Sequence, residues 1–355
     1  HFGTGLATLT QNLDTQPETA MKIKIFEAEP WECPGFESLQ EEHELDCVDE
    51  PLTGKNAGQY ADVEVVSTFI YSQLDRSVLE QLESLKMIAT RSTGFDHIDV
   101  DYCREHDITI ANVPTYGQNT VAEHVFGLLL TLSHNLYEAV DRTRRGDFSP
   151  KGLQGFDLYG KTLGVVGTGD IGQCVIRIAK GFAMRVIAYD VQEDEGAAQA
   201  LNFEYVDMDR LLTESDVITL HVPGSEKTRH LISHEAFDKM KEGVVLINTA
   251  RGEVVDMQAL VRALAEGKVA GAGLDVLPEE PVVREEAELL RSVYQRKHNL
   301  ESLLADSVVM RVRNVVVTPH SAFNTREAVH RIIEVTAANI EAFAAGQPQN
   351  VVPPR

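Results

Sequence analysis

The stretch that decides the fold spans residues 163–190 and reads LGVVGTGDIGQCVIRIAKGFAMRVIAYD. Its apolar start, residues 163–166, predicts a buried strand, and three glycines in GxGxxG spacing then open a run of helical character at 173–182. A second strand-like run at 186–189 ends at Asp190. Strand, glycine turn, helix and strand in this order predict a βαβ unit with two parallel strands.

Each glycine of this stretch has a physical reason to be there. Gly167 permits a tight turn, Gly169 lets a pyrophosphate approach the backbone, and Gly172 lets the helix pack against the strand. Asp170 and Ile171, between these glycines, are also expected to contact the cofactor, beside a helix N-terminus whose free N–H groups and dipole attract phosphate. The alternative is a glycine turn without a ligand, but the surrounding order of elements favours a dinucleotide site.

Asp190 indicates which dinucleotide the site takes. It lies 18 residues after Gly172, where a carboxylate accepts hydrogen bonds from both hydroxyls of the adenosine ribose. A 2′-phosphate at that place would be repelled, and neither of the next two residues is an arginine that could receive one. The sequence therefore predicts NAD rather than NADP as the cofactor.

Composition limits the class of protein. The 355 residues are enough for two domains, and 43% hydrophobic with 25% charged residues is typical of a soluble globular chain. A net charge of −23 argues against nucleic acid and anionic membrane as partners, and no apolar run is long enough for a membrane span. The four cysteines lack CxxC spacing, which predicts reduced thiols, no metal site and a cytoplasmic location.

Strands alternating with helices extend over most of the chain and predict parallel sheets. Residues 1–20 are interpreted as a leader or a remnant of cloning, and the first strand begins after Met21. Residues 119–148 predict one long helix with Thr120 as its N-cap and Glu123 completing a capping box. Residues 281–313 are predicted to be a surface insertion with at least one helix, from the helical spacing of Leu289, Leu290, Val293 and Leu300.

Three titratable or charged residues follow predicted strands, where ligands bind in open α/β sheets. Arg251 follows VVLINTA, Glu280 follows AGAGLDVLPE, and His320 follows NVVVTP. An arginine can clamp a carboxylate, a histidine can donate or accept a proton, and a carboxylate can stabilise the protonated histidine. Each residue alone could be a surface pair or a cap. Together with NAD they predict hydride transfer to an α-keto acid.

The chain resembles the D-isomer-specific 2-hydroxyacid dehydrogenase family, and within it most closely the D-lactate dehydrogenases. The resemblance is carried by RSTGFDHID, NVPTYGQNTVAEH, VVGTGDIG, INTARGEVVD, GAGLDVLPEEP and VVVTPHSAFNT, in the family's order. It implies an α/β fold of two doubly wound parallel-sheet domains. A Rossmann NAD-binding domain at 119–321 would be inserted into a flavodoxin-like substrate domain made of 21–118 and 322–355. It also implies a homodimer formed through the NAD-binding domains.

The resemblance further implies roles for single residues. Arg251 matches the substrate-binding arginine, Glu280 the catalytic carboxylate and His320 the acid/base histidine. Other matching positions are cofactor contacts at Val222, Pro223, Thr228, Thr249, Ala250, Arg251 and Asp275, and substrate contacts at Tyr71, Thr93, Gly94, Tyr116 and Phe323. For His124 and Glu123 we expect packing or capping rather than catalysis. The long interval between Glu280 and His320 departs from the family's pattern.

The predicted function is therefore NAD-dependent reduction of a small 2-keto acid, with pyruvate and D-lactate as the favoured pair. Glyoxylate, hydroxypyruvate and aromatic 2-keto acids stay open as alternative substrates. A different class also stays open, because NAD-sensing corepressors share this fold and can keep the same three residues.

Overall fold

The computed structural model describes residues 20–278, 305 and 307–353. Residues 1–19 of the predicted leader at 1–20, Glu280 and the predicted helix around residues 289–300 lie outside the described residues. The chain divides into two compact units, residues 1–116 with 326–355 and residues 117–325. The second unit is thus inserted into the first, with junctions at 116/117 and 325/326, where the sequence predicted 118/119 and 321/322.

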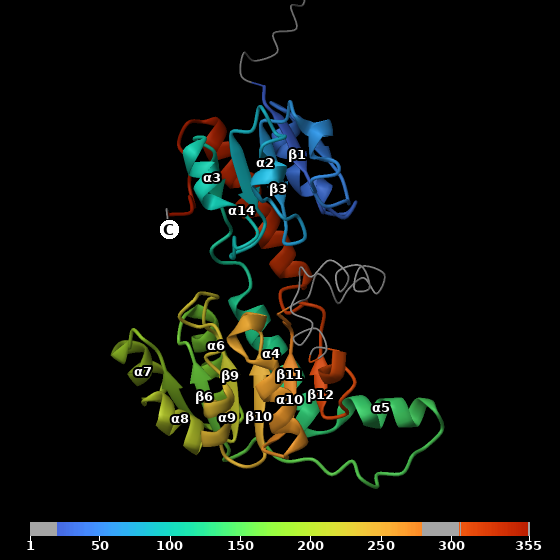
Figure 1. Ribbon diagram of the computed structural model, residues 1–355, viewed down its shortest axis with the longest axis vertical. Coiled ribbons are helices and arrows are strands. Elements are labelled where there is room, and N and C mark those ends of the chain that lie inside the picture. The colour runs from blue at the N-terminus through green and yellow to red at the C-terminus, as the bar shows by residue number, and fades with distance from the viewer. Residues whose placement is uncertain (1–19, 279–304, 306, 354–355) are drawn as a thin grey trace, which may run out of the picture. The chain divides into compact units, whose positions relative to one another are not determined.

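The first unit has a five-stranded parallel sheet in the order β2-β1-β3-β4-β5, which is the flavodoxin-like order. Its strands are β1 (Lys22–Ile25), β2 (Glu44–Cys47), β3 (Val65–Thr68), β4 (Met87–Thr90) and β5 (Thr109–Ala111). Its helices are η1 (Cys33–Phe36), α1 (Glu37–Gln40), η2 (Ala57–Tyr60), α2 (Arg76–Leu79), α3 (Val100–Glu105) and α14 (Arg326–Ala344). The C-terminal helix α14 packs against η1 and β4, so the returning chain completes this unit (Figure 1).

The second unit has a seven-stranded parallel sheet in the order β12-β11-β10-β9-β6-β7-β8. Its strands are β6 (Thr162–Val166), β7 (Arg185–Tyr189), β8 (Glu204–Tyr205), β9 (Val217–Leu220), β10 (Val244–Asn248), β11 (Val269–Leu274) and β12 (Val315–Val317). Counted from β6, this is the Rossmann order 3-2-1-4-5-6 with one more strand at the edge. The predicted fold class of two parallel-sheet α/β domains is confirmed.

Helices cover both faces of this second sheet, because its strands are apolar on both sides. Along β10, Val245 and Ile247 face the core under α4 and α6, whereas Leu246 faces the core under α8, α9 and α10. The helices are α4 (Gln118–Ser133), α5 (Leu136–Arg144), α6 (Asp170–Gly181), α7 (Glu195–Leu201), α8 (Met208–Glu214), α9 (His234–Lys239), η3 (Gly252–Val254) and α10 (Met257–Ala265).

The prediction of one long helix from residue 119 is wrong. The chain forms α4 and then α5, and Asn135 between them has a left-handed φ of 51°. The break is held from further along the chain, because the amide of Phe156 donates to the carbonyl of Ser133 over 2.9 Å and the side-chain amide of Asn135 donates to Leu153. Gly155 is needed there, since a Cβ would lie 1.9 Å from the Ser133 carbonyl oxygen.

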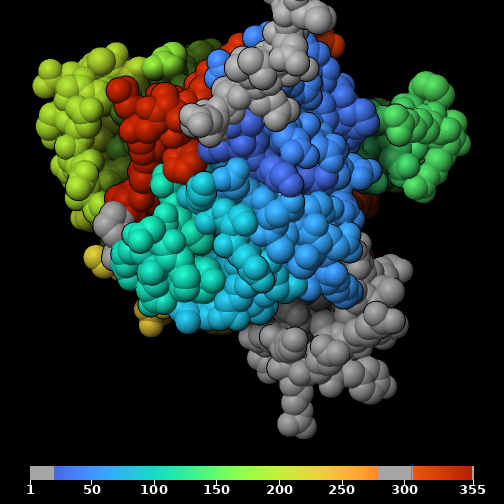
Figure 2. All heavy atoms as spheres, turned by 90° about the horizontal axis from the view of Figure 1, so that it is seen from above, coloured from blue at the N-terminus to red at the C-terminus, as the bar shows by residue number. Residues whose placement is uncertain are grey.

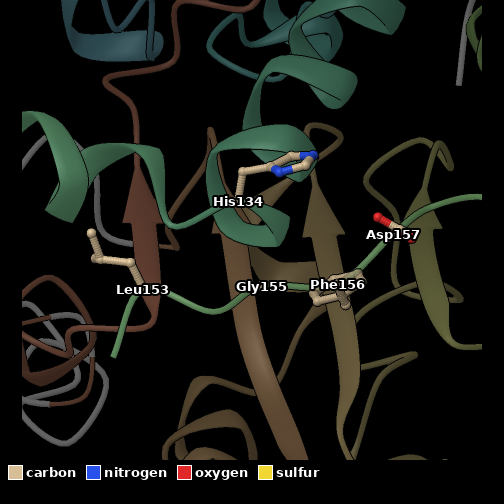
Figure 3. A pocket seen from close by; sticks show the side chains of 5 residues that line it. All are labelled: His134, Leu153, Gly155, Phe156 and Asp157. Atoms are coloured by element: carbon tan, nitrogen blue, oxygen red, sulfur yellow. The ribbon is translucent and has the colours of Figure 1, made fainter. Parts of the chain in front are cut away.

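The predicted capping box is wrong as well. Thr120 lies inside α4 and is buried, and the N-cap is Gly117, which makes no side-chain cap bond. The segment that ends α4 leaves a cavity of about 320 Å³ lined by His134, Leu153, Gly155, Phe156 and Asp157 (Figure 3). It lies at the break between the two helices, away from the strand ends described below.

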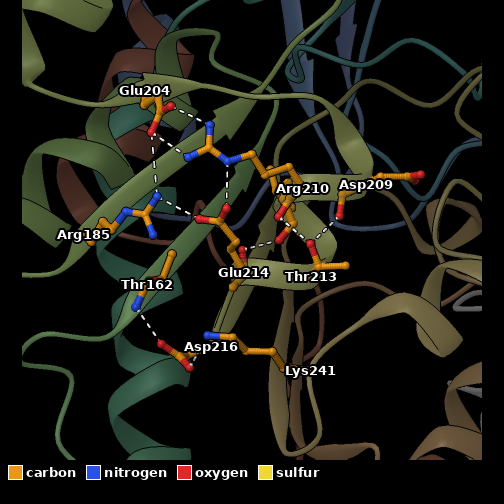
Figure 4. Close-up of polar contacts among 11 residues, drawn as sticks. Thr162, Arg185, Glu204, Asp209, Arg210, Thr213, Glu214, Asp216 and Lys241 are labelled. Atoms are coloured by element: carbon orange, nitrogen blue, oxygen red, sulfur yellow. Dashed lines mark hydrogen bonds and ion pairs between the residues drawn. The ribbon is translucent and has the colours of Figure 1, made fainter.

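Ion pairs gather at the edge of the second sheet where the strands begin (Figure 4). Arg210 pairs with Glu204 and Glu214 at 2.5 and 2.7 Å, and Arg185 pairs with Glu214 at 2.8 Å. These hydrogen bonds hold the pKa values of Glu204 and Glu214 below their ordinary range. Since the network is well exposed to solvent, it contributes little to stability.

Over residues 20–278, 305 and 307–353, no helix has the length and apolar character needed to cross a membrane. Within the same ranges, no group of three or more His, Cys, Asp or Glu side chains is placed to hold a metal ion.

Candidate active site

The predicted residues of the second unit share one edge of its sheet. Because all neighbouring strands are parallel, the residues that directly follow them lie at the same carboxyl edge. Gly167 follows β6, Asp190 follows β7, Val222 follows β9, Arg251 follows β10, Asp275 follows β11 and His320 follows β12.

The glycine loop after β6 fits a pyrophosphate. Gly167 has a φ of +95°, and a Cβ there would lie 2.5 Å from the carbonyl oxygen of His221. At Gly172 an added Cβ would lie 2.1 Å from the Gly167 carbonyl oxygen, so helix and strand are in close contact. At Gly169, by contrast, an added Cβ would meet no protein atom within 4 Å among the described residues. Gly169 is also the N-cap of α6 without a side-chain cap, which leaves N–H groups of Asp170 and Ile171 for a ligand.

Asp190 is held in place by residues that sequence reasoning did not single out. Its Oδ2 accepts hydrogen bonds from the amide and the hydroxyl of Thr168, at 2.7 and 3.0 Å, and its Oδ1 accepts one from the amide of Gln192. The Thr168 hydroxyl also contacts the Tyr205 hydroxyl at 2.8 Å. Burial opposes ionisation of Asp190, but the bonds from Thr168, Gln192 and Val191 outweigh it and lower the pKa. These bonds favour the charged carboxylate and fix its orientation.

The loop after β9 is held by a hydrogen bond between two of its own residues. The hydroxyl of Thr228 donates to the carbonyl of Pro223 over 2.7 Å, which shapes the backbone following Val222. His221 precedes this loop and contacts the Thr219 hydroxyl at 2.9 Å. Desolvation lowers the pKa of His221 to about 3, so this histidine stays neutral at neutral pH.

Arg251 is positioned by its own loop. Its Nη1 donates to the carbonyl of Ala250 at 2.8 Å, and the side chain of Asn248 donates to the Arg251 carbonyl at 2.9 Å. The hydroxyl of Thr249 is buried without a hydrogen-bond partner among the described residues, which is the kind of group that a bound cofactor satisfies. At Gly252 an added Cβ would lie 2.2 Å from the backbone of Leu277, so the loops after β10 and β11 pack closely.

Asp275 organises the loop that carries His320. It is 2% exposed, and its carboxylate accepts hydrogen bonds from the hydroxyl of Thr318 and the amides of Ser321 and Ala322, at 2.5, 2.9 and 2.9 Å. Nε2 of His124 lies 3.0 Å from the Thr318 hydroxyl.

From the sequence, Asp275 was predicted to contact the cofactor and His124 to have a packing role. The sequence did not reveal that Asp275 and His124 both contact Thr318, in the loop that carries His320. The sequence signal that could have pointed to Thr318 is its place in TPH.

The predicted substrate residues of the first unit lie around the end of β4. Thr93 is exposed and its hydroxyl donates to the carbonyl of Val113 at 2.9 Å. In the part of the chain that the structure describes, the amides of Thr93 and Gly94 donate to no acceptor. Tyr71 is 46% exposed, and its amide donates to the carboxylate of Glu27. The carbonyl of Tyr116 accepts a hydrogen bond from Arg331 at 2.6 Å.

Comparison with known proteins decides the family. Residues 126–322 match the family model described as D-isomer specific 2-hydroxyacid dehydrogenase, NAD binding domain. The chain belongs to the D-isomer-specific 2-hydroxyacid dehydrogenases. The resemblance read from the sequence motifs is thereby confirmed, and the chain is an NAD-dependent oxidoreductase whose cofactor is NAD.

Relatives of this dehydrogenase carry several names. It is 37% identical to the D-lactate dehydrogenase of Escherichia coli, over 92% of this chain and 98% of that protein. It is 35% identical to the glyoxylate reductase of Korarchaeum cryptofilum, over 94% of this chain and 96% of that protein. Among solved structures, D-lactate dehydrogenase from Aquifex aeolicus, complexed with NAD and lactic acid, matches with a TM-score of 0.80 and 36% identity, covering 92% of this chain and 96% of that one.

Proposed function

We propose that this dehydrogenase reduces pyruvate to D-lactate, with His320 as the proton donor. The observation that carries the proposal is the succession of Arg251, Asp275 and His320 after the neighbouring strands β10, β11 and β12. A carboxylate clamp, a loop anchor and an acid/base group thus share one sheet edge, beside a glycine loop that fits NAD.

The proposed roles follow from the chemistry of each group. NADH supplies the hydride that reduces C2 of the keto acid. His320 donates a proton to the oxygen on C2, and in the reverse direction it accepts that proton. Arg251 holds the carbonyl and the carboxylate through its planar guanidinium. Glu280, which lies outside the described residues, is proposed to stabilise the protonated form of His320.

In the first unit, we propose that the amides of Thr93 and Gly94 bind the carboxylate of the keto acid. Their N–H groups have no acceptor among the described residues, as a group that awaits an anion should. Tyr71 and Tyr116 in this unit, with Phe323 in the other, are proposed to limit the size of the acid. The first unit, residues 1–116 with 326–355, is then the substrate domain, and the second unit, residues 117–325, is the NAD-binding domain.

Glyoxylate is the second candidate substrate, favoured by the similarity to a glyoxylate reductase. The test is the rate of NADH oxidation with pyruvate, glyoxylate, hydroxypyruvate and phenylpyruvate. We expect the highest kcat/KM with pyruvate. A higher value with glyoxylate, hydroxypyruvate or phenylpyruvate would replace pyruvate as the substrate but leave the reaction class unchanged.

We also propose a homodimer formed through the second unit. Large apolar side chains are exposed on α5 and in the chain after it, with Tyr137 73% and Phe148 81% exposed. Figure 1 shows α5 reaching away from the sheet of its own unit. Exposed apolar groups of this size are typical of an interface. Light scattering should give twice the mass of the chain, and Tyr137→Glu with Phe148→Glu should give a monomer. A wild-type monomer at micromolar concentration contradicts the proposal.

A cytoplasmic location is proposed from the cysteines. All four are free thiols, and Cys103 is buried. Free thiols persist in a reducing compartment. Recovery of the protein in a secreted or periplasmic fraction would contradict this.

A further inference from the structure

Three asparagines of the first unit form a closed ring of hydrogen bonds. The backbone N–H of Asn112 donates to the backbone carbonyl of Asn350 at 3.1 Å. The side chain of Asn350 donates to Oδ1 of Asn339 at 2.8 Å, and the side chain of Asn339 donates to the carbonyl of Asn112 at 2.9 Å. Asn339 lies on α14 and is only 1% exposed, and both the nitrogen and the oxygen of its side-chain amide take part in this ring.

The ring continues into the loop that is proposed to bind the substrate. The side chain of Asn112 donates to the carbonyl of Thr93 at 2.8 Å, and the Thr93 hydroxyl donates to the next carbonyl along, that of Val113, at 2.9 Å. The amide of Val113 in turn donates to the carbonyl of Ser92 at 3.0 Å. Residues 92–93 are therefore bonded to residues 112–113 at three points, beside the amides of Thr93 and Gly94.

The C-terminal chain supplies the rest of the support. Val351 forms an antiparallel bridge with Ala111, and the amide of Val352 donates to the carbonyl of Ile110 at 2.9 Å. Val352 is 9% exposed and belongs to the core of this unit. Figure 2 shows the C-terminal residues of the unit lying against its N-terminal half. The returning chain thus pairs with β5, the strand that leads into Asn112.

We propose that Asn339 is a positioning residue for the keto acid, acting through Asn112 on the amides of Thr93 and Gly94. The inference rests on the proposed function of these amides. A buried side-chain amide that bonds one tail and one loop fixes both, and its loss removes the protein partner of the Asn112 carbonyl and of the Asn350 side-chain amide. The loop binds the carboxylate of the keto acid, which does not react, so it binds the substrate and the transition state about equally. Loosening the loop therefore raises KM more than it lowers kcat.

The test compares Asn339→Ala, Asn350→Gly and a matched control, Asn56→Ala. Asn350 has a φ of 51°, so glycine keeps the backbone and removes only the side-chain bond. Asn56 lies in the same unit and also bonds backbone with its side chain, but takes no part in the ring. KM and kcat for the keto acid, NADH affinity, melting temperature and amide exchange of residues 91–95 are measured for each.

We expect KM to rise about threefold to tenfold in Asn339→Ala, the size of one lost hydrogen bond, and less in Asn350→Gly. Amide exchange in residues 91–95 should quicken in both, while kcat and NADH affinity change less than about twofold and Asn56→Ala keeps the wild-type KM. If Asn339→Ala does not fold, the KM and amide exchange of Asn350→Gly test the inference by themselves.

Unchanged KM and unchanged exchange in a folded ring variant would overturn the inference. So would an equal loss of NADH affinity, because that indicates general loosening. A wild-type protein inactive toward every 2-keto acid would overturn the proposed function and this inference together. Activity with an unchanged KM in the ring variants overturns the inference alone.

Discussion

The backbone amide of His320 donates a hydrogen bond to the carbonyl oxygen of Asp275 over 2.9 Å. His320 has a left-handed φ of 51°, a conformation that costs a non-glycine residue roughly 1 kcal/mol. The backbone of Asp275 holds this residue directly, while its carboxylate holds the amides of Ser321 and Ala322. Asp275 follows β11 and His320 follows the neighbouring strand β12, so Asp275 holds the backbone of His320 from the adjacent strand.

Asp275→Asn should lower both stability and kcat. The carboxylate accepts from Thr318, Ser321 and Ala322 and lies 3.4 Å from Nε2 of His124, so an amide nitrogen in its place would face a donor, at a cost of about 1–3 kcal/mol. We expect kcat to fall at least about tenfold, since 1.4 kcal/mol is a factor of ten. Unfolding in urea and steady-state rates measure the two effects, with the exposed Asp238→Asn as control. Wild-type kcat in Asp275→Asn would show that the loop needs no anchor.

Cofactor preference should depend on Asp190 and on the residues that orient it. Asp190→Ala should lose NADH affinity by about tenfold to a hundredfold, the value of a hydrogen bond to a charged group, and should narrow the preference over NADPH. Tyr205→Phe removes a hydroxyl that contacts Thr168 and accepts a bond from the Asp194 amide but leaves the carboxylate of Asp190 in place, so the preference for NADH over NADPH should narrow less. The ratio of kcat/KM for NADH and NADPH measures this. Equal values in the wild type would contradict the assignment to Asp190.

Acid should destabilise the fold partly through His221. Burial lowers its pKa in the folded protein to about 3, whereas the unfolded chain has the ordinary value of about 6.5. The unfolded state therefore binds more protons between these values, and stability must fall as the pH falls from about 6.5 toward 3. His221→Gln, which can still bond Thr219, should flatten this dependence in urea titrations. An equally steep dependence in the variant would mean that His221 is protonated in the folded protein.

Central parts of the fold were predictable because their signals are local. The strands β6, β9, β10 and β11 are buried on both faces and appear in the sequence as apolar runs. The strands β2, β5 and β8 were not identified, since they lie at sheet edges, are two to four residues long and, for β2 and β8, are partly exposed. The break after α4 depends on Phe156, more than twenty residues beyond Ser133, so no local pattern revealed it.

For the candidate site, the sequence could indicate which residues follow the strands, but not which residues hold them in place. Residues at strand ends could be named because parallel strands bring them to one edge. The residues that hydrogen-bond to them could not be named from the sequence. Tyr205 reaches Thr168 from another strand, and Asn339 reaches Asn112 from 227 positions away in the chain. Such contacts depend on how distant segments pack, which residue spacing does not encode.

The most direct test of the central claim is kcat for pyruvate reduction by His320→Ala, with exposed His330→Ala as the matched control. General acid catalysis is worth roughly 10²–10⁴-fold, and we predict a fall in kcat of that size. NADH affinity and folding should stay close to wild type, and His330→Ala should be unaffected. A folded His320→Ala enzyme with near wild-type kcat would contradict the account, because another group would then have to donate the proton.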